Sequence, residues 1–357
     1  MQRTTVIAGA VLAALSTLGT ATPALAQSNV TIYGIIDTGV EYLSNAGPGG
    51  SALRVSSGGM NNSRLGFRGS EDLGGGLKAV FNLESGLLTD VGAYDGGLFR
   101  RQANVGLEGA FGRVVIGRSF TTVYDFIVGF DPMAYAPYYS WASSGSASGA
   151  STYSMATSAD NIVKYSLDSG PLKFGATYAF GEQTTGIADG ARMQLATAYT
   201  AGMFSLVATA EQSNGNNVAA TDRHDKTNVV HLGGMVSSGD FKVQLVGRTY
   251  KTESNNRALP DVRANTYWAG LTYKATPAMT LVGAVYYTDV RNVAAGADAD
   301  PKMYVARARY ALSKRTDVYL TGAYTRAKNG KLISLSRNEA GFADHQRALM
   351  AGVQHRF

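Results

Sequence analysis

The sequence predicts an all-β protein, a transmembrane antiparallel β-barrel of about sixteen strands. Three observations predict this fold. Apolar and polar residues alternate with a period of two over one segment after another. The connections between these segments are alternately long and short along the whole chain. Beyond the N-terminal 26 residues, no window of the sequence approaches the roughly 18 consecutive apolar residues that a membrane-spanning helix needs.

The N-terminal segment has the features of an export signal. Arg3 precedes the apolar run VIAGAVLAALSTLGTA, and Ala24-Leu25-Ala26 supplies the small residues that a signal peptidase requires. We therefore expect residues 1–26 to be a signal peptide and residues 27–357 to form one β-barrel domain. The alternative is a helix that remains as a membrane anchor.

The first predicted strand runs from Val30 to Tyr42. Its even-numbered residues are mostly apolar, and its odd-numbered residues include Tyr33, Asp37 and Glu41. A globular strand usually has about five to six residues. The greater length suits a tilted strand that crosses a membrane, with one face toward lipid and the other toward a polar lumen.

The same alternation continues to the C-terminus. Predicted strands follow at 63–73, 77–85, 98–109, 112–119, 160–167, 171–181, 190–200, 203–212, 226–237, 241–252, 262–274, 279–290, 301–312, 316–327 and 345–357. Long connections lie near 44–62, 86–97, 119–159, 181–190, 212–226, 252–263, 290–301 and 327–345, with short turns between them. Outer-membrane barrels have short turns at one rim and longer loops at the other. A soluble sandwich has no reason to keep this alternation.

Composition narrows the possible functions. The chain has no cysteine, so an exported form needs a stabilising element other than disulfides, such as a closed hydrogen-bond ladder in lipid. The net charge of +6 is spread along the chain without a basic block, which argues against nucleic-acid binding. The four histidines lack metal-ligand spacing, and no catalytic motif occurs. We expect no enzyme activity, no cofactor and no metal.

The longest predicted connection, residues 119–159, has only two charged side chains, Asp125 and Asp131, and is rich in Tyr, Phe and Ser. A structureless loop of this length is uncommon in a compact domain and is usually functional or disordered. The aromatic residues in its first half argue against disorder. We expect the loop to fold into the barrel and to constrict the lumen.

A barrel of about sixteen strands encloses more space than side chains fill, so water enters it. Arg64, Arg68 and Arg100 lie on the inward faces of strands that precede the long loop. Opposite Asp131, such a positive wall would impose a transverse field on a narrow, wet slot and select solutes by charge. Three arginines against one or two acids predict a mild anion preference. Asp125 is expected mainly to anchor the loop. Further basic residues lie on polar faces of later strands, namely Arg192, Lys242, Arg248, Arg307 and Arg309.

Several segments resemble one family. VTIYGIIDTGVEY, SRLGFRGSEDLGGGLKAVFNLESG, LFRRQANVGLEGAFGRVVIGRSF and the terminal QHRF resemble Gram-negative general porins of the trimeric, sixteen-stranded type, closest to the betaproteobacterial branch. The resemblance implies a homotrimer in the cell outer membrane of a Gram-negative bacterium, whose third loop folds inward. The expected partners are small ions and hydrophilic solutes, outer-membrane lipid and lipopolysaccharide. Phe357 at the end resembles the signal recognised by the barrel-assembly machinery.

The resemblance also assigns residues on the arginine side of the constriction. Arg64 matches the wall arginine that follows the first long loop, and Arg100 matches the wall arginine of the fourth strand. Its neighbour Arg101 falls on the outward face and is expected to serve structure or the trimer contact. Ser158 stands where relatives often carry a basic residue, so this side would carry less positive charge.

On the loop side, the YDxxxxxD pattern of the enterobacterial relatives matches Tyr124, Asp125 and Asp131, and Asp131 is expected to line the pore. Tyr135 stands where those relatives carry a second loop acid. The predicted function is a water-filled channel for passive diffusion of small hydrophilic solutes. Two alternatives are a channel specific for one solute class, with the Tyr/Trp-rich loop as its binding site, and an exported soluble β-protein such as an adhesin.

Overall fold

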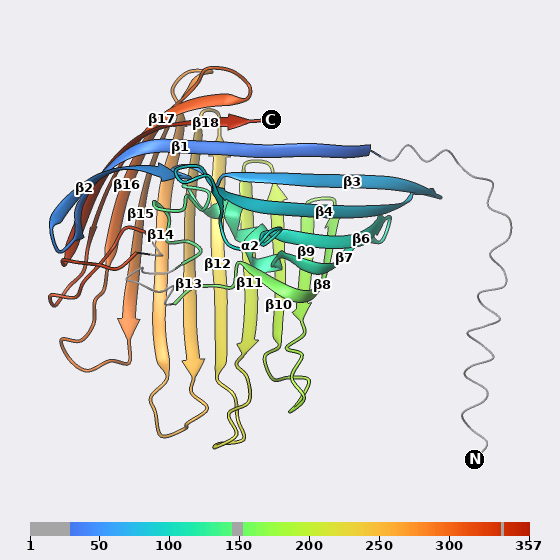
Figure 1. Cartoon of the computed structure of the whole chain (residues 1–357). Coiled ribbons are helices and arrows are strands. Elements are labelled where there is room, and N and C mark those ends of the chain that lie inside the picture. Colours follow the sequence, from blue (N-terminus) through green and yellow to red (C-terminus); the bar gives the residue numbers. More distant parts are fainter. Residues whose placement is uncertain (1–28, 145–152, 337–338) are drawn as a thin grey trace, which may run out of the picture.

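The computed structural model describes residues 29–144, 153–336 and 339–357, which form a closed antiparallel β-barrel (Figure 1). The predicted signal peptide, residues 1–26, lies outside the described residues. The first strand, β1 (Asn29–Gly47), and the last, β18 (His345–Arg356), pair with each other and close the wall. Closure matters in a membrane because an open sheet edge would leave backbone N–H and C=O groups without partners in lipid.

Sixteen strands form the wall within the described ranges, as predicted. One of the sixteen is built from two segments, β2 (Gly50–Ser57) and β3 (Arg64–Gly74), which pair with successive parts of β1. The two-residue β5 (Ala93–Tyr94) lies in a loop and pairs with the end of β4. The other wall strands are β4 (Leu77–Leu88), β6 (Gln102–Gly109), β7 (Gly112–Phe120), β8 (Ser158–Ser169), β9 (Leu172–Ala179), β10 (Arg192–Ala201), β11 (Phe204–Asn214), β12 (Lys226–Ser238), β13 (Phe241–Glu253), β14 (Val262–Lys274), β15 (Met279–Arg291), β16 (Lys302–Ala311) and β17 (Thr316–Arg326).

The predicted alternation of connections is confirmed except at its first member. The prediction of a long loop at 44–62 is wrong, because the chain turns tightly between Gly47 and Gly50 and continues as β2. Leu53 and Val55 are 75% and 52% exposed on the outer side of β2. The glycines and serines of residues 47–59 are typical of loops, so the composition did not indicate this strand.

Residues 58–63, GGMNNS, break the wall between β2 and β3 and fold inward. The buried carboxylate of Asp37 holds this segment by accepting hydrogen bonds from the backbone N–H groups of Gly59, Met60 and Asn61, at 2.9–3.0 Å. Tyr319 of β17 donates a further hydrogen bond to Asp37, at 2.7 Å. The segment therefore becomes a fixed part of the inner wall.

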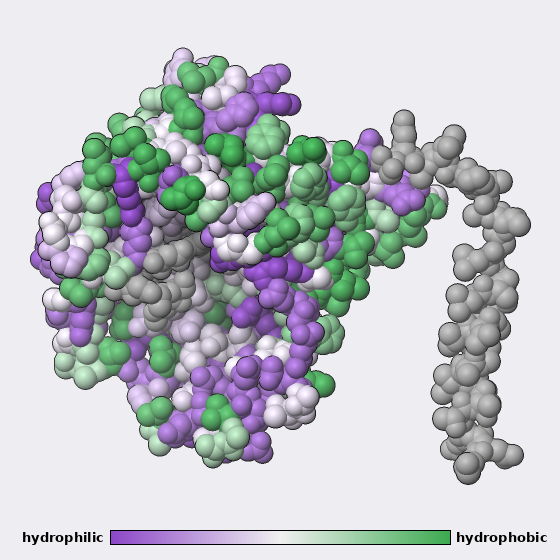
Figure 2. All heavy atoms as spheres, in the orientation of Figure 1, coloured by the Kyte–Doolittle hydropathy of each residue, from purple (hydrophilic) through white to green (hydrophobic). Residues whose placement is uncertain are grey.

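The two faces of the wall differ in polarity. Outward side chains such as Ile32, Leu232, Leu245 and Leu349 are more than half exposed, whereas the inward Gln244 is buried. Figure 2 shows hydrophobic side chains gathered over the outside of the strands and hydrophilic ones over the long loops at the lower edge. An apolar outer band around a polar interior is the arrangement that a lipid bilayer stabilises.

No helix among the described residues combines the length and the apolar character needed to cross a membrane.

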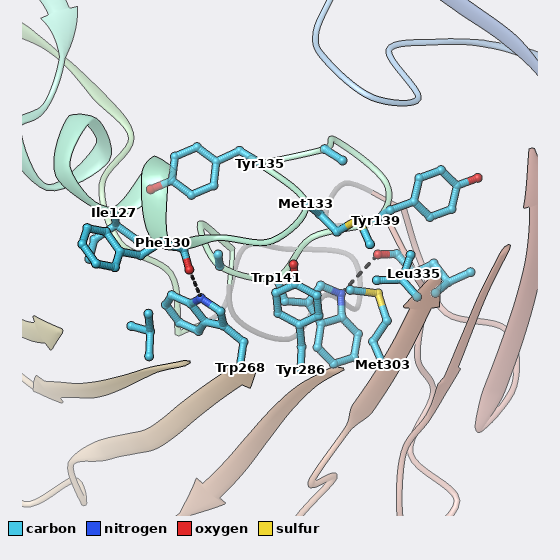
Figure 3. Packing of buried hydrophobic residues seen from close by; sticks show 14 of the residues in the cluster. Ile127, Phe130, Met133, Tyr135, Tyr139, Trp141, Trp268, Tyr286, Met303 and Leu335 are labelled. Carbon is cyan, nitrogen blue, oxygen red and sulfur yellow. Dashed lines mark hydrogen bonds between the residues drawn. The ribbon is translucent and has the colours of Figure 1, made fainter. Parts of the chain in front are cut away.

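A long connection after β7 lies inside the barrel. It begins with α2 (Thr122–Ile127) and the 3-10 helix η1 (Val128–Phe130), and the chain returns to the wall at β8 (Figure 1). We call residues 121–157 the constriction loop, of which 145–152 lie outside the described residues. Its apolar side chains and the inner faces of β12–β18 form the main hydrophobic cluster (Figure 3). The part of 119–159 that the structure describes thus folds inward, as predicted.

Candidate pore constriction

The constriction loop is anchored to wall strands on the far side of the lumen. Indole Nε1 of Trp268 in β14 donates a hydrogen bond to the Phe130 carbonyl at 3.1 Å (Figure 3). The Trp141 indole on the loop donates to the Leu335 carbonyl at 3.2 Å, and the Tyr139 hydroxyl donates to Glu41 of β1 at 2.6 Å. These contacts hold the loop against the wall from β14 round to β1.

Asp131 is part of this anchored side. Its carboxylate accepts hydrogen bonds from the Tyr286 hydroxyl of β15 at 2.5 Å and the Ser140 hydroxyl at 2.7 Å. The backbone N–H groups of Met133 and Tyr135 donate to it as well, which is the local turn geometry that aspartate favours. Burial raises the pKa of the Asp131 carboxyl, and its hydrogen-bond donors oppose that shift.

The position of Asp131 differs from the sequence prediction. The carboxylate was expected to line the pore, yet the residue is only 2% exposed and lies within the packed core of the loop. Spacing along the loop places an acid near the constriction but does not show to which side its side chain turns. Here Pro132 and the positive φ angles of Ala134 and Tyr135 bend the chain around the carboxylate.

Two of the later wall arginines also act as anchors. Arg248 is 1% exposed and donates to the Ala142 carbonyl of the loop at 2.7 Å. Arg307 is 8% exposed and donates to the Gly59 carbonyl of the inward segment at 3.3 Å. Their guanidinium groups therefore fix backbone segments. Arg192 and Arg309 lie near the buried carboxylates of Glu211 and Asp317, at 3.7 and 3.9 Å.

A polar cleft, which we call the slot, lies on the other side of the loop, between the loop and the wall around β3–β8. Its lining from the wall side includes Asn62, Asp95, Arg100, Arg101, Arg118, Phe120 and Ser158, and its lining from the loop side includes Tyr124, Tyr135 and Thr157. Tyr135 and Ser158, where the resemblance led us to expect charges, thus both face the slot. Neither position carries a charge in this chain.

Three arginines line the wall side of the slot, and a fourth, Arg64, lies beside them and shares an acidic partner with Arg101. Nε of Arg101 lies 2.6 Å from Oε1 of Glu84, and Nε of Arg64 lies 3.8 Å from the other oxygen of the same carboxylate. Arg118 pairs with Asp160 at 2.5 Å. Arg100 pairs with Asp95 at 3.0 Å, and its carbonyl accepts a hydrogen bond from Nε of Arg118. Four guanidinium groups therefore share three carboxylates.

Aromatic rings line the slot where the constriction loop leaves β7. The rings of Phe120 and Tyr124 stack with centroids 4.4 Å apart, and the Tyr124 and Tyr135 centroids are 4.7 Å apart. The Tyr135 hydroxyl donates to the Tyr124 carbonyl, and Arg101 lies over the Phe120 ring, 5.1 Å from its centroid. The arginines thus face rings and backbone, where the sequence prediction placed an acid.

Two of these arginines were not identified as pore residues from the sequence. Arg101 was assigned to the outward face, but it reaches Glu84 in the lumen; β6 begins only at Gln102, and Phe99 has a positive φ of 55°. Residues 98–101 are not part of the strand, so counting inward and outward positions through them assigns Arg101 to the wrong face. Arg118 follows Gly117, whose φ of 125° accompanies a register shift between β7 and β8. A glycine within a strand often marks such a bulge, so Gly117 was the signal in the sequence that Arg118 turns inward.

The five predicted constriction residues therefore occupy four places. Arg100 lines the slot, Arg64 lies beside it against Glu84, and Asp131 lies in the anchored core. Arg68 lies farther toward the short-turn rim, with its guanidinium 5.1 Å from the centroid of the Tyr33 ring. Asp125 on α2 pairs with Lys164 of β8 at 2.8 Å, in agreement with an anchoring role. Their roles in selectivity stay predictions.

Comparison with known proteins gives one consistent result. The family model described as Gram-negative porin matches residues 8–330 of this chain. Outer membrane porin protein 32 of Delftia acidovorans is 32% identical, over 97% of this chain and 99% of its own length. An outer membrane porin protein of Bordetella pertussis is 29% identical with the same coverage. Among solved structures, an anion-selective porin from Comamonas acidovorans superposes with a TM-score of 0.79 at 26% identity, covering 93% of this chain and 100% of that one. The trimer form of OmpT of Vibrio cholerae shares the fold, with a TM-score of 0.71 at 18% identity.

Proposed function

We propose that this chain, which belongs to the family of Gram-negative porins, favours anions over cations in its channel. Porins of this family are outer-membrane barrels, and this one forms a water-filled channel for the passive diffusion of small hydrophilic solutes. The direction and origin of its charge preference are the proposed part. The anion-selective porin from Comamonas acidovorans gives the same direction.

The observation that carries the proposal is the imbalance of charge at the slot. The arginines there outnumber their acidic partners by one, four to three; they are Arg64, Arg100, Arg101 and Arg118. Asp131 is buried on the opposite side of the loop. Rings of arginine or lysine favour anions in a pore because low-dielectric walls focus the field of the charges on the passing ion. Because each arginine already has a partner, the preference is mild.

Reversal potentials in a KCl gradient test the proposal. We expect the purified protein in planar bilayers to pass chloride in preference to potassium. The double variant Arg100→Gln with Arg118→Gln should lower the chloride-to-potassium permeability ratio about threefold, because each lost charge changes the local potential by a fraction of a kcal/mol. Both partner acids, Asp95 and Asp160, are solvent-exposed, so the barrel should fold normally.

The control is Arg223→Gln, which removes an exposed cation from the long connection between β11 and β12. It should leave the reversal potential unchanged. A wild-type channel that prefers potassium would overturn the proposal. An anion-selective wild type whose reversal potential does not move in the double variant would overturn only the assignment to these arginines.

The assembly belongs to the same proposal. We expect a homotrimer, supported by the trimer form of the structural relative OmpT, with outer-membrane lipid and lipopolysaccharide around it. We also expect cleavage after Ala26 and recognition of Phe357 by the barrel-assembly machinery. Gel migration before and after heating reports the trimer, and the mass of the purified chain reports the cleavage.

A further inference from the structure

A second polar cleft lies in the lumen near the short-turn rim. Residues from the starts and ends of β1, β3, β4, β6 and β7 line its volume of about 370 Å³. Three of them are cations, Arg68, Lys78 and Arg113, which we call the second cation cluster, and one is an acid, Glu108. Lys78 and Arg113 each lie close to a short turn, the first after residues 74–76 and the second after Gly112. In outer-membrane barrels this rim faces the periplasm.

The second cation cluster is incompletely neutralised. Arg113 lies 3.5 Å from Glu108, and both side chains are more than 40% exposed. Within the ranges that the structure describes, neither Arg68 nor Lys78 has a carboxylate oxygen within 4.0 Å of its charged nitrogens. Asp72 and Glu108 stand opposite Lys78 in the strand register without an ion pair to it, and the Asp72 carboxylate accepts a hydrogen bond from the backbone N–H of Gly74 at 2.9 Å.

The cluster is separate from the slot. Arg64 and Arg68 point inward from the same strand four residues apart, which corresponds to about 14 Å along the strand. At physiological ionic strength the Debye length is about 8 Å, so most of the field of the slot arginines is screened at this distance. An anion that has left the slot therefore meets a new group of cations.

We propose that Arg68, Lys78 and Arg113 form a second anion-binding site, for small oxyanions that carry two or more charges on carboxylate or phosphate groups. A polyvalent anion in this cleft is attracted by all three cations at once, through water where it does not touch them, and each of its charges adds to that attraction, whereas chloride carries only one charge. Water reaches these side chains, so the binding is transient and release into the periplasm is fast. This inference rests on the proposed anion-favouring channel and concerns a different place in it.

Citrate, which is trivalent at neutral pH, is a suitable probe. Protein inserted in one orientation into a planar bilayer in 0.1 M KCl is titrated with citrate from each side in turn. We expect citrate added at the short-turn side to reduce the chloride current at the lower concentration. The double variant Arg68→Gln with Lys78→Gln should raise that half-blocking concentration about fivefold, the size expected from two exposed charge contacts. The block should disappear in 1 M KCl, where the Debye length is about 3 Å.

Three further variants make the result unambiguous. Lys173→Gln, the matched control, removes a cation near the same rim that already pairs with Asp168 at 3.4 Å, and it should not change the block. Lys78→Glu should weaken the block more than the double glutamine variant. If the block instead persists in Arg68→Gln with Lys78→Gln and is lost in Arg100→Gln with Arg118→Gln, citrate binds only at the slot and the second site is wrong. The reversal potential of the wild type in KCl alone separately reports the proposed function.

Discussion

The two sides of the constriction loop have opposite chemistry. Toward β12–β18 and β1 the loop is dry, with Trp141, Met133 and Tyr139 packed on wall residues such as Trp268 and Tyr286 (Figure 3). Toward β3–β8 it faces a wet slot lined by guanidinium groups. The loop therefore does more than reduce the cross-section of the lumen. It fills one side of the lumen and leaves the water-filled part against the cationic wall.

The inner wall explains which side is filled. On β13–β18 the inward positions include apolar side chains, among them Val246, Trp268, Tyr286, Met303 and Met350. On β3–β7 the inward positions include Arg64, Glu84, Asn104 and Arg118. Burial of apolar area drives the loop to the first group of strands, because the same contact against the second group would desolvate charges.

The largest effect should follow from removal of the main polar anchor on the dry side. Asp131→Ala leaves the Tyr286 and Ser140 hydroxyls and two backbone N–H groups without an acceptor, and each such loss costs roughly 1–3 kcal/mol. We expect the loop to detach while the barrel stays closed. Single-channel conductance and current noise should both rise, and the thermal unfolding temperature should fall.

Ser140→Ala is the graded comparison, because it removes one donor and leaves the acceptor satisfied by three others. It should produce a small fraction of the conductance change. If Asp131→Ala leaves conductance, noise and melting at wild-type values, the loop is held without this carboxylate, by apolar packing and by the hydrogen bonds of Trp268, Trp141, Tyr139 and Arg248.

A smaller effect should come from pushing the loop off the wall. Gly270 of β14 faces inward, and a Cβ built there collides with the Pro132 ring. Gly270→Val should therefore displace the loop toward the slot, destabilise the fold by about 1–3 kcal/mol and lower the conductance. Single-channel recording measures the result. The control is Gly283→Val at an outward position of the neighbouring strand, where an added Cβ meets nothing within 4 Å. Equal effects of the two substitutions would refute this loop placement.

The fold was predictable from the sequence because it depends on repetition. Alternation and turn residues recur in every hairpin, so a local error such as the missed β2 leaves the strand number unchanged. The site depends on single positions, and there the period of two is not a sufficient guide. Phe99 and Gly117 each interrupt the alternation with a positive φ, and these interruptions bring Arg101 and Arg118 into the lumen.

The side of the lumen that the loop fills was also indicated in the sequence. Large apolar residues at inward positions, such as Trp268, Tyr286 and Met303, have no place in a water-filled lumen unless another segment covers them. Their concentration in the second half of the chain therefore marks the wall that receives the loop. What the sequence did not contain is the direction of the Asp131 side chain, which depends on a turn closed by its own carboxylate.

The smallest effect is expected at the other acid of the loop. Asp125 is 43% exposed, and its partner Lys164 also donates to the Ser119 hydroxyl and the Phe120 carbonyl. Asp125→Asn should therefore leave Lys164 in place and change stability by less than about 1 kcal/mol, the usual range for an exposed pair. Conductance should stay at the wild-type value, while the reversal potential should move slightly toward anion preference, because the Lys164 charge loses its counterion. Asp168→Asn, which breaks the exposed pair with Lys173, provides the comparison for a loss of charge at the rim. A conductance rise as large as that of Asp131→Ala would show instead that the wet side, too, holds the loop through a carboxylate.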